Sequence, residues 1–101
     1  MIPQARTPAP INAMTYLLIR HRVADFATWK PVYDAHALAR AAAGLTDVDL
    51  LRELDDPNQI VLLFEVSDLQ KAKEFADSPS LRDAMRNAGV IDKPDLYFLE
   101  R

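Results

Sequence analysis

Two histidines are the side chains in this sequence best suited to chemistry near neutral pH. His21 lies in a stretch rich in β-forming residues, and His36 lies in a long stretch of helical periodicity. Imidazole titrates near pH 7 and is the usual general base of enzymes. A pair of imidazoles beside aromatic side chains suits removal of a proton from a phenol or an enolisable ketone. We therefore take His36 and His21 as candidate catalytic residues.

Two other interpretations of the histidines stay open. Buried polar side chains are usually satisfied by hydrogen bonds, so either histidine can be a structural core residue. The pair could also bind a metal, which would require a third ligand such as Asp or Glu. The sequence shows no recognised metal-ligand spacing, and we predict neither a metal nor a cofactor.

Arg40 follows His36 by one helical turn. Its guanidinium could hold a carboxylate, a phenolate or an enolate oxygen. Alternatively, it forms an ion pair with Asp or Glu, or extends its aliphatic stem towards solvent. Several large apolar and aromatic side chains suit either a core or the wall of a hydrophobic pocket. The candidate substrate-binding residues are Trp29, Tyr33, Arg40, Phe64 and Met85.

Residues 25–44, DFATWKPVYDAHALARAAAG, must position most of this candidate site. Their apolar residues recur at the helical period, which predicts one amphipathic helix. Asp25 can cap its first amides, and Gly44 can form the left-handed turn that ends it. Pro31 predicts an irregular first turn. His36 and Arg40 interrupt the middle of the apolar face.

Residues 15–23, TYLLIRHRV, predict the strand that precedes this helix. Alternation places His21 on the same face as Leu17, Ile19 and Val23, which should contact the helices. His36 should point from the helix to the sheet. The two histidines could therefore meet in one cavity.

The rest of the chain completes a sheet and a second helical segment. Residues 46–54 and 60–66 predict a hairpin around the turn at residues 55–58, with Val48, Leu50 and Leu54 alternating with acidic residues in the first strand. Residues 68–88 predict a helix that breaks and restarts at Ser78-Pro79. Residues 95–100 predict a last strand.

This order, β-α-β-β-α-β, predicts an α+β fold of the ferredoxin-like type. Such a fold has a four-stranded antiparallel sheet with its helices on one face. We assign residues 15–101 to this domain and residues 1–14 to a Pro-rich N-terminal extension. The other sheet face would expose apolar residues to water, so we expect a homodimer that packs sheet on sheet.

Composition restricts the partners of the protein. The chain has 101 residues, a net charge of −3 and no cysteine. The negative charge argues against nucleic acid, whose affinity depends on Lys and Arg. The absence of cysteine excludes disulfides and thiolate chemistry. No segment reads as a membrane span or a signal peptide, so we expect a cytoplasmic protein without a membrane partner.

Four segments carry a resemblance to a known family: HRVADFATWKPVYDAHALARAAAG, RELDDPN, VLLFEVSDLQKAKEF and SPSLRDAMRNAGV. Together they resemble the dimeric α+β barrel superfamily over residues 15–101. They look most like its small, often uncharacterised members related to antibiotic biosynthesis monooxygenases. The resemblance implies a cavity between helices and sheet. It also implies activities such as cofactor-free oxygenation of anthrones or quinols, isomerisation, or polyketide cyclisation.

Three functions stay open at this stage. The first is a cofactor-independent monooxygenase, cyclase or isomerase acting on an aromatic or polyketide-like molecule. The second is a non-catalytic dimer that binds a small hydrophobic ligand, and the third is a purely structural dimer. Haem-degrading relatives use a histidine that we would expect within residues 68–88, and this segment has none. Cavity volume should separate the third function from the others, because a space below roughly 100 Å³ cannot hold a drug-sized ligand, whose pockets typically exceed about 300 Å³.

Overall fold

The computed structural model of the chain describes residues 14–101, and the predicted extension lies outside the described residues except for Met14. The helices and strands are β1 (Thr15–Arg22), α1 (Phe26–Ala35), α2 (Ala37–Ala42), β2 (Leu45–Arg52), β3 (Gln59–Val66), α3 (Leu69–Ala76), α4 (Pro79–Asn87) and β4 (Asp95–Glu100).

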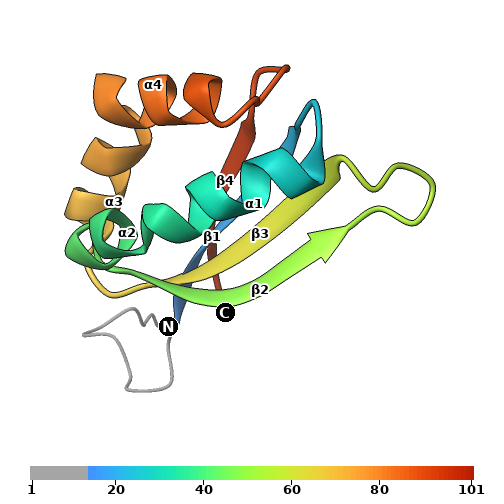
Figure 1. Cartoon of the computed structure of the whole chain (residues 1–101). Helices are drawn as coiled ribbons and strands as arrows, with labels where there is room; N and C mark the ends of the chain where they lie inside the picture. Colours follow the sequence, from blue (N-terminus) through green and yellow to red (C-terminus); the bar gives the residue numbers. More distant parts are fainter. Residues whose placement is uncertain (1–13) are drawn as a thin grey trace, which may run out of the picture.

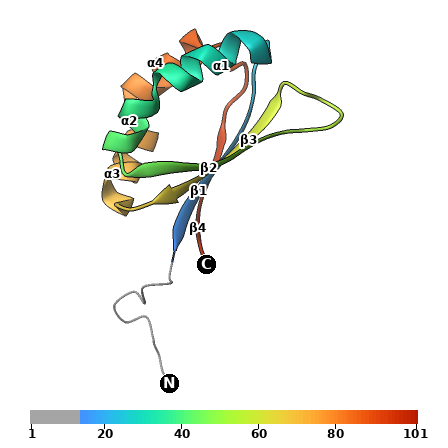
Figure 2. The ribbon, with the colours of Figure 1, turned by 60° about the horizontal axis from the view of Figure 1, so that its bottom comes forward.

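The four strands form one antiparallel sheet in the order β2-β3-β1-β4. All four helices lie on one side of it (Figures 1 and 2). The β1–β3 register pairs Leu17 with Phe64, Ile19 with Leu62 and His21 with Ile60. These side chains are buried and make up much of the core beneath the helices. The predicted α+β arrangement and the inward direction of His21 are confirmed.

The helix over residues 25–44 was predicted as continuous, and that is wrong. Asp25 caps α1 as expected, with its carboxylate accepting a hydrogen bond from the amide of Thr28. The helix stops at Ala35 and α2 begins at Ala37, with His36 between them. Pro31 lies inside α1, which is helical from Phe26, so the predicted irregular first turn is absent.

The second helical segment breaks where the sequence predicts. Ser78 accepts a hydrogen bond from the amide of Leu81 through its hydroxyl, and Pro79 takes the first position of α4. Gly44 and Gly89 follow α2 and α4 with φ of +80° and +91°. A Cβ at Gly44 would approach the Ser67 hydroxyl to 3.0 Å, so a side chain there meets both strain and crowding.

The β2 strand begins and ends at other residues than predicted, and its side chains are distributed differently between the two faces of the sheet. It runs over Leu45–Arg52, and Leu54 is 99% exposed in the loop before β3. The register against β3 shifts between Asp47 and Asp49, which leaves Val48 in a bulge. Asp47 is paired with Phe64 and therefore lies on the helix side of the sheet. The predicted alternation of Val48, Leu50 and Leu54 on one face is therefore wrong.

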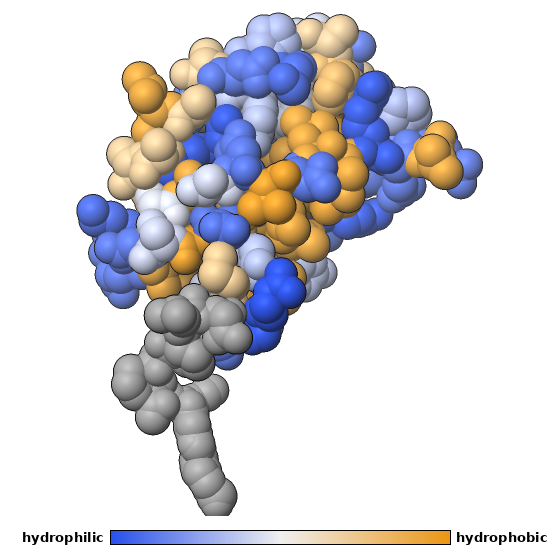
Figure 3. Space-filling view, turned by 90° about the horizontal axis from the view of Figure 1, so that it is seen from below, coloured by the Kyte–Doolittle hydropathy of each residue, from blue (hydrophilic) through white to orange (hydrophobic). Residues whose placement is uncertain are grey.

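The sheet face away from the helices carries apolar side chains near its middle (Figure 3). Leu18 and Leu63 are directly paired there, and Tyr97 is paired with Leu18 from the other side. Leu51, Tyr97 and Leu99 are 53%, 52% and 43% exposed. Within residues 14–101, no helix has the length and apolar character needed to cross a membrane.

Candidate functional site

A cavity lies between the helices and the sheet, and all seven candidate site residues line it. The space that water can reach is about 60 Å³, and the whole hollow between the walls, including its part open to solvent, is about 530 Å³. The smaller space, which is the one to compare with cavity volumes, lies well below the roughly 300–1,000 Å³ of typical ligand sites. By volume alone the cavity therefore favours the purely structural interpretation. A ligand of aromatic size would need the open mouth and a movement of the walls.

His21 enters the cavity from β1. Its side chain is 3% exposed, and neither ring nitrogen has a hydrogen-bond partner among the described residues. The ring packs edge-on against Trp29, with 5.7 Å between centroids. Burial lowers the pKa of His21, and the carboxylate of Asp92 opposes this effect. The imidazole is therefore neutral at pH 7 and can both donate and accept a hydrogen bond.

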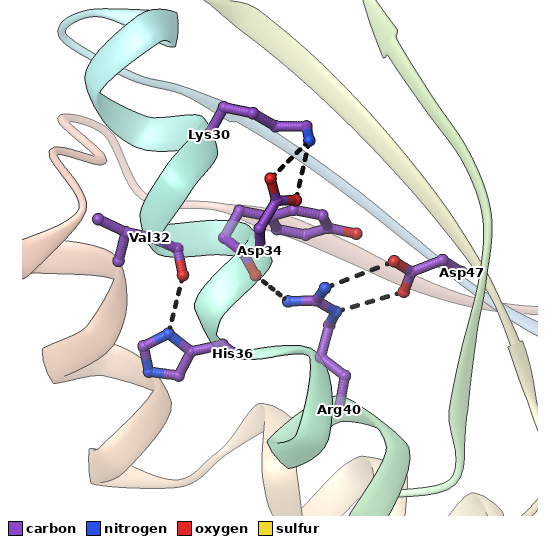
Figure 4. A network of polar contacts seen from close by, with 7 residues as sticks. Lys30, Val32, Asp34, His36, Arg40 and Asp47 are labelled. Carbon is purple, nitrogen blue, oxygen red and sulfur yellow. Dashed lines mark hydrogen bonds and ion pairs between the residues drawn. The ribbon is translucent and has the colours of Figure 1, made fainter.

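His36 lies at the break between α1 and α2 and is exposed to solvent. Its backbone amide donates to the carbonyl of Tyr33, which leaves the carbonyl of Val32 free. The Nδ1–H of His36 donates to that carbonyl at 3.0 Å (Figure 4). Since a carbonyl only accepts, Nδ1 carries the proton and Nε2 of the neutral ring is an acceptor. His36 thus lines the open part of the cavity rather than the core.

Arg40 is buried in α2 and makes several contacts in the cavity wall (Figure 4). It donates to the backbone carbonyl of Tyr33 at 2.7 Å. Its Nε and Nη2 donate to the two carboxylate oxygens of Asp47 at 3.3 and 3.4 Å. The guanidinium carbon lies 3.7 Å from the centroid of the Tyr33 ring. His36 and Arg40 together satisfy the last carbonyls of α1, which are the groups that a helix end leaves without partners.

Two aromatic rings of α1 form a stacked wall. The Trp29 and Tyr33 rings lie 4.8 Å apart between centroids, inclined by 25°. Trp29 is 2% exposed, and Tyr33 is half-buried. Burial raises the pKa of Tyr33 to about 12, with Arg40 lowering it and Asp47 raising it. Tyr33 therefore remains a neutral phenol at physiological pH.

The remaining predicted residues complete the apolar lining. Phe64, on β3, is 1% exposed and belongs to the core cluster as well as the cavity wall. Met85, on α4, is half-buried. The unbranched thioether adapts to gaps of different shape, so Met85 is suited to move when a ligand enters.

Sequence reasoning missed several lining residues and the partner of Arg40. The missed lining residues are Ile19, Val32, Leu45, Leu62, Phe75, Leu81, Ala84 and Ala88. Helical periodicity in the second helical segment could have found those on α3 and α4. Asp47 could not be found, because the alternation expected for residues 46–54 ignores the bulge at Val48. Among residues 14–101, no group of three or more His, Asp or Glu side chains could hold a metal ion.

Comparisons with solved structures show which fold this is. A "putative antibiotic biosynthesis monooxygenase" from Bordetella bronchiseptica matches with a TM-score of 0.71 and 14% identity, over 89% of this chain and 98% of that one. A protein of the same name from Caulobacter crescentus matches with a TM-score of 0.66 and 16% identity, over 88% and 90%.

A nipsnap family protein of unknown function from Agrobacterium tumefaciens also matches, with a TM-score of 0.60 and 16% identity over 87% of each chain. No protein-family model and no curated protein matches the sequence. The chain shares the ferredoxin-like fold of these solved structures, and the predicted fold class is confirmed.

Proposed function

We propose that the protein is a small homodimer that binds an aromatic or polyketide-like molecule in the helix–sheet cavity and oxidises it with O₂ without a cofactor. The observation that carries this proposal is His21. A buried imidazole with no partner at either nitrogen is costly to the folded protein, because an unsatisfied buried polar group costs about 1–3 kcal/mol. Neither nitrogen is accessible to solvent in this structure, so a ligand oxygen would satisfy the imidazole after neighbouring side chains have moved.

The two histidines have different parts in this reaction. The bond from Nδ1 of His36 to Val32 leaves Nε2 as the basic nitrogen. His36 is therefore the general base that takes a proton from the substrate at the mouth. Neutral His21, deeper in the cavity, donates a hydrogen bond to the substrate oxygen on which negative charge develops. The Trp29 and Tyr33 rings, stacked on each other, form an aromatic wall against which the substrate packs.

The overall reaction balances without an external reductant. An enolisable ketone with an activated CH₂ group loses a proton to His36, and the resulting carbanion reacts with O₂. One oxygen atom becomes a new carbonyl at that carbon. The other leaves as water with the two hydrogens of the CH₂ group. The substrate supplies all four electrons that reduce O₂.

The bare sheet face supports the homodimer. Leu51, Tyr97 and Leu99 would lose their contact with water if two such faces met (Figure 3). Burial of apolar area stabilises an assembly by about 25 cal/mol per Å². Sedimentation velocity at micromolar concentration should show a dimer. Leu51→Glu combined with Tyr97→Glu should shift it to monomer, and a monomeric wild-type protein would contradict this part of the proposal.

A second function, non-catalytic ligand binding, is favoured by the contacts of His36 and Arg40. Both side chains satisfy carbonyls at the end of α1, and this gives each a reason to be present without catalysis. The cavity would then bind the same class of ligand and release it unchanged.

Oxygen uptake with anthrone separates the two functions. We expect the protein to accelerate uptake over the protein-free rate, and His36→Asn to reduce the acceleration by about 10²-fold, within the usual contribution of a general base. The Asn amide can still donate to Val32, so this variant keeps the structural bond and loses the base. Ser80→Ala, at an exposed position outside the cavity lining, is the control and should leave the rate unchanged.

Two outcomes would contradict the catalytic proposal. Acceleration that persists in both His36→Asn and His21→Leu would exclude these side chains from the reaction. Saturable quenching of Trp29 fluorescence by anthrone without oxygen uptake would instead support the binding function, since Trp29 is the one tryptophan of the chain and lines the cavity.

A further inference from the structure

We infer that Asp47 determines the charge specificity of the cavity: by pairing with Arg40 it makes the site accept uncharged aromatic ligands and reject carboxylates of the same shape. This inference rests on the proposal that the cavity binds aromatic molecules, and it holds for either the catalytic or the binding function.

Arg40 carries the permanent positive charge of the cavity wall. Apart from Arg40 and the two histidines, the lining side chains of the described residues are apolar or aromatic. The Arg40 side chain is 8% exposed, so a ligand in the cavity would meet its charge with little screening by water. An unpaired guanidinium in this place would attract carboxylates, because its planar donors match a carboxylate in geometry.

The pairing with Asp47 removes this attraction for carboxylates. Its carboxylate accepts from both Nε and Nη2 of Arg40, while Nη1 donates to the carbonyl of Tyr33. The Tyr33 ring covers one face of the guanidinium. Asp47 does not line the cavity, and its side chain is 53% exposed. The compensating charge is therefore placed behind the wall, and the Arg40–Asp47 pair has no net charge.

A carboxylate entering the cavity would compete with Asp47 for the same guanidinium. It would lose its hydration among apolar side chains without gaining a free cation, which is unfavourable. The nearby charges on α1 do not help, because Lys30 is paired with Asp34 at 2.8 Å. A neutral hydroxyl or amide loses less hydration on entering the same cavity. The pairing thus discriminates between ligands by charge alone.

The test uses two probes of nearly equal shape, 4-hydroxybenzamide and 4-hydroxybenzoate. Binding is followed by the NMR signal of the Trp29 indole N–H in full-length protein. We expect the wild-type protein to bind the amide at least about tenfold more tightly than the carboxylate, since about 1.4 kcal/mol corresponds to tenfold. This measurement needs no variant.

Asp47→Asn removes the compensating charge and leaves an amide of the same shape. We expect the preference for the amide to fall by about tenfold or to reverse, because the charge of Arg40 is then uncompensated and attracts the carboxylate. Asp49→Asn is the matched control, since it removes the same charge from the same strand on the face away from the helices. Asp47→Glu keeps the charge and should retain the wild-type preference, so the inference stays testable if Asp47→Asn does not fold.

Each outcome decides something different. Equal binding of the two probes by wild-type protein would overturn this inference and leave the proposed function standing. An equal change of preference in Asp47→Asn and Asp49→Asn would also overturn it, because net charge alone would then explain the effect. Binding of neither probe, by wild-type protein or by any variant, would overturn both the inference and the proposed ligand-binding cavity.

Discussion

The cavity wall around Arg40 and the wall around His21 both place a polar group among apolar side chains, and they differ in how that group is satisfied. Arg40 has a carboxylate, a carbonyl and an aromatic face as partners. His21 is equally buried, yet both of its ring nitrogens lack a partner among the described residues.

This difference gives Arg40 a structural explanation and leaves His21 as the buried polar group for which we propose a function. The contacts of Arg40 hold the break between α1 and α2 and connect it to β2, so the fold itself gives a reason for a buried arginine. The ring of His21 packs against Trp29, and among the described residues its two nitrogens have no hydrogen-bond partner. Buried polar groups without partners are rare in folded proteins, and either water or a ligand in the cavity would supply the missing partner.

The largest change in stability is expected from the removal of the Arg40 side chain. Arg40→Ala removes the bonds to Tyr33 and Asp47 and the stacking on the Tyr33 ring, and it leaves a space in the wall. We expect the free energy of unfolding to fall by about 2–4 kcal/mol, since hydrogen bonds to charged groups contribute about 1.5–3 kcal/mol and a cavity adds to the loss. Urea denaturation measures it.

Arg82 provides the matched control for this prediction. Its Nη1 donates to the carbonyl of Asp77 at 3.2 Å, at the break between α3 and α4, and the residue is exposed. We expect Arg82→Ala to change the free energy of unfolding by less than about 0.5 kcal/mol. If Arg40→Ala and Arg82→Ala lowered the free energy of unfolding equally, burial of the arginine at a helix break would make no difference, and this prediction would be wrong.

We expect a smaller change in stability from the protonation of His21 at acidic pH. Burial lowers the pKa of His21 in the folded protein below its ordinary value of 6.5. The unfolded chain therefore binds more protons than the folded protein below about pH 6.5, and stability rises with pH in that window. We expect the contribution of neutral His21 to be complete above pH 6.5 and to fall by at most about 1.4 kcal/mol per pH unit as the medium becomes more acidic.

The smallest change in stability is expected from a substitution of His21 near neutral pH. His21→Leu removes the two unsatisfied nitrogens and keeps a buried apolar side chain of similar size. We expect the free energy of unfolding at pH 7.5 to stay within about 1 kcal/mol of the wild-type value, and the acid-dependent slope below pH 6.5 to become shallower. A loss as large as that of Arg40→Ala would mean that His21 has a structural role after all.

Sequence patterns predicted the fold because several independent signals agree in this chain. The capping residues Asp25 and Ser78 and the two glycines mark helix ends by local chemistry, and β1 alternates clearly. The inward position of His21 follows from the alternation in β1 alone. The seven candidate residues were chosen by type and phase, and all line one cavity.

The contacts of the site could not be predicted from local signals. No glycine or proline marks the break at His36, and its backbone ends α1 with φ of −95° and ψ of 13°. The ion pair of Arg40 depends on the bulge at Val48, which turns Asp47 to the helix side against the simple alternation. Both features arise from the packing of elements distant in sequence, which periodicity within one segment does not report.

The pairing of β1 with β4 has a consequence for how the protein folds. Thr15 is paired with Glu100, so this ladder joins the two ends of the described chain. Contacts between residues far apart in sequence form slowly, because a long loop must close before they stabilise the chain. The cavity is lined by residues of β1, β3 and the helices and by none of β4, so it needs the β1–β3 ladder, which pairs residues 15–22 with 59–66. A chain whose synthesis has not yet reached β3 lacks this ladder, and it has no binding site.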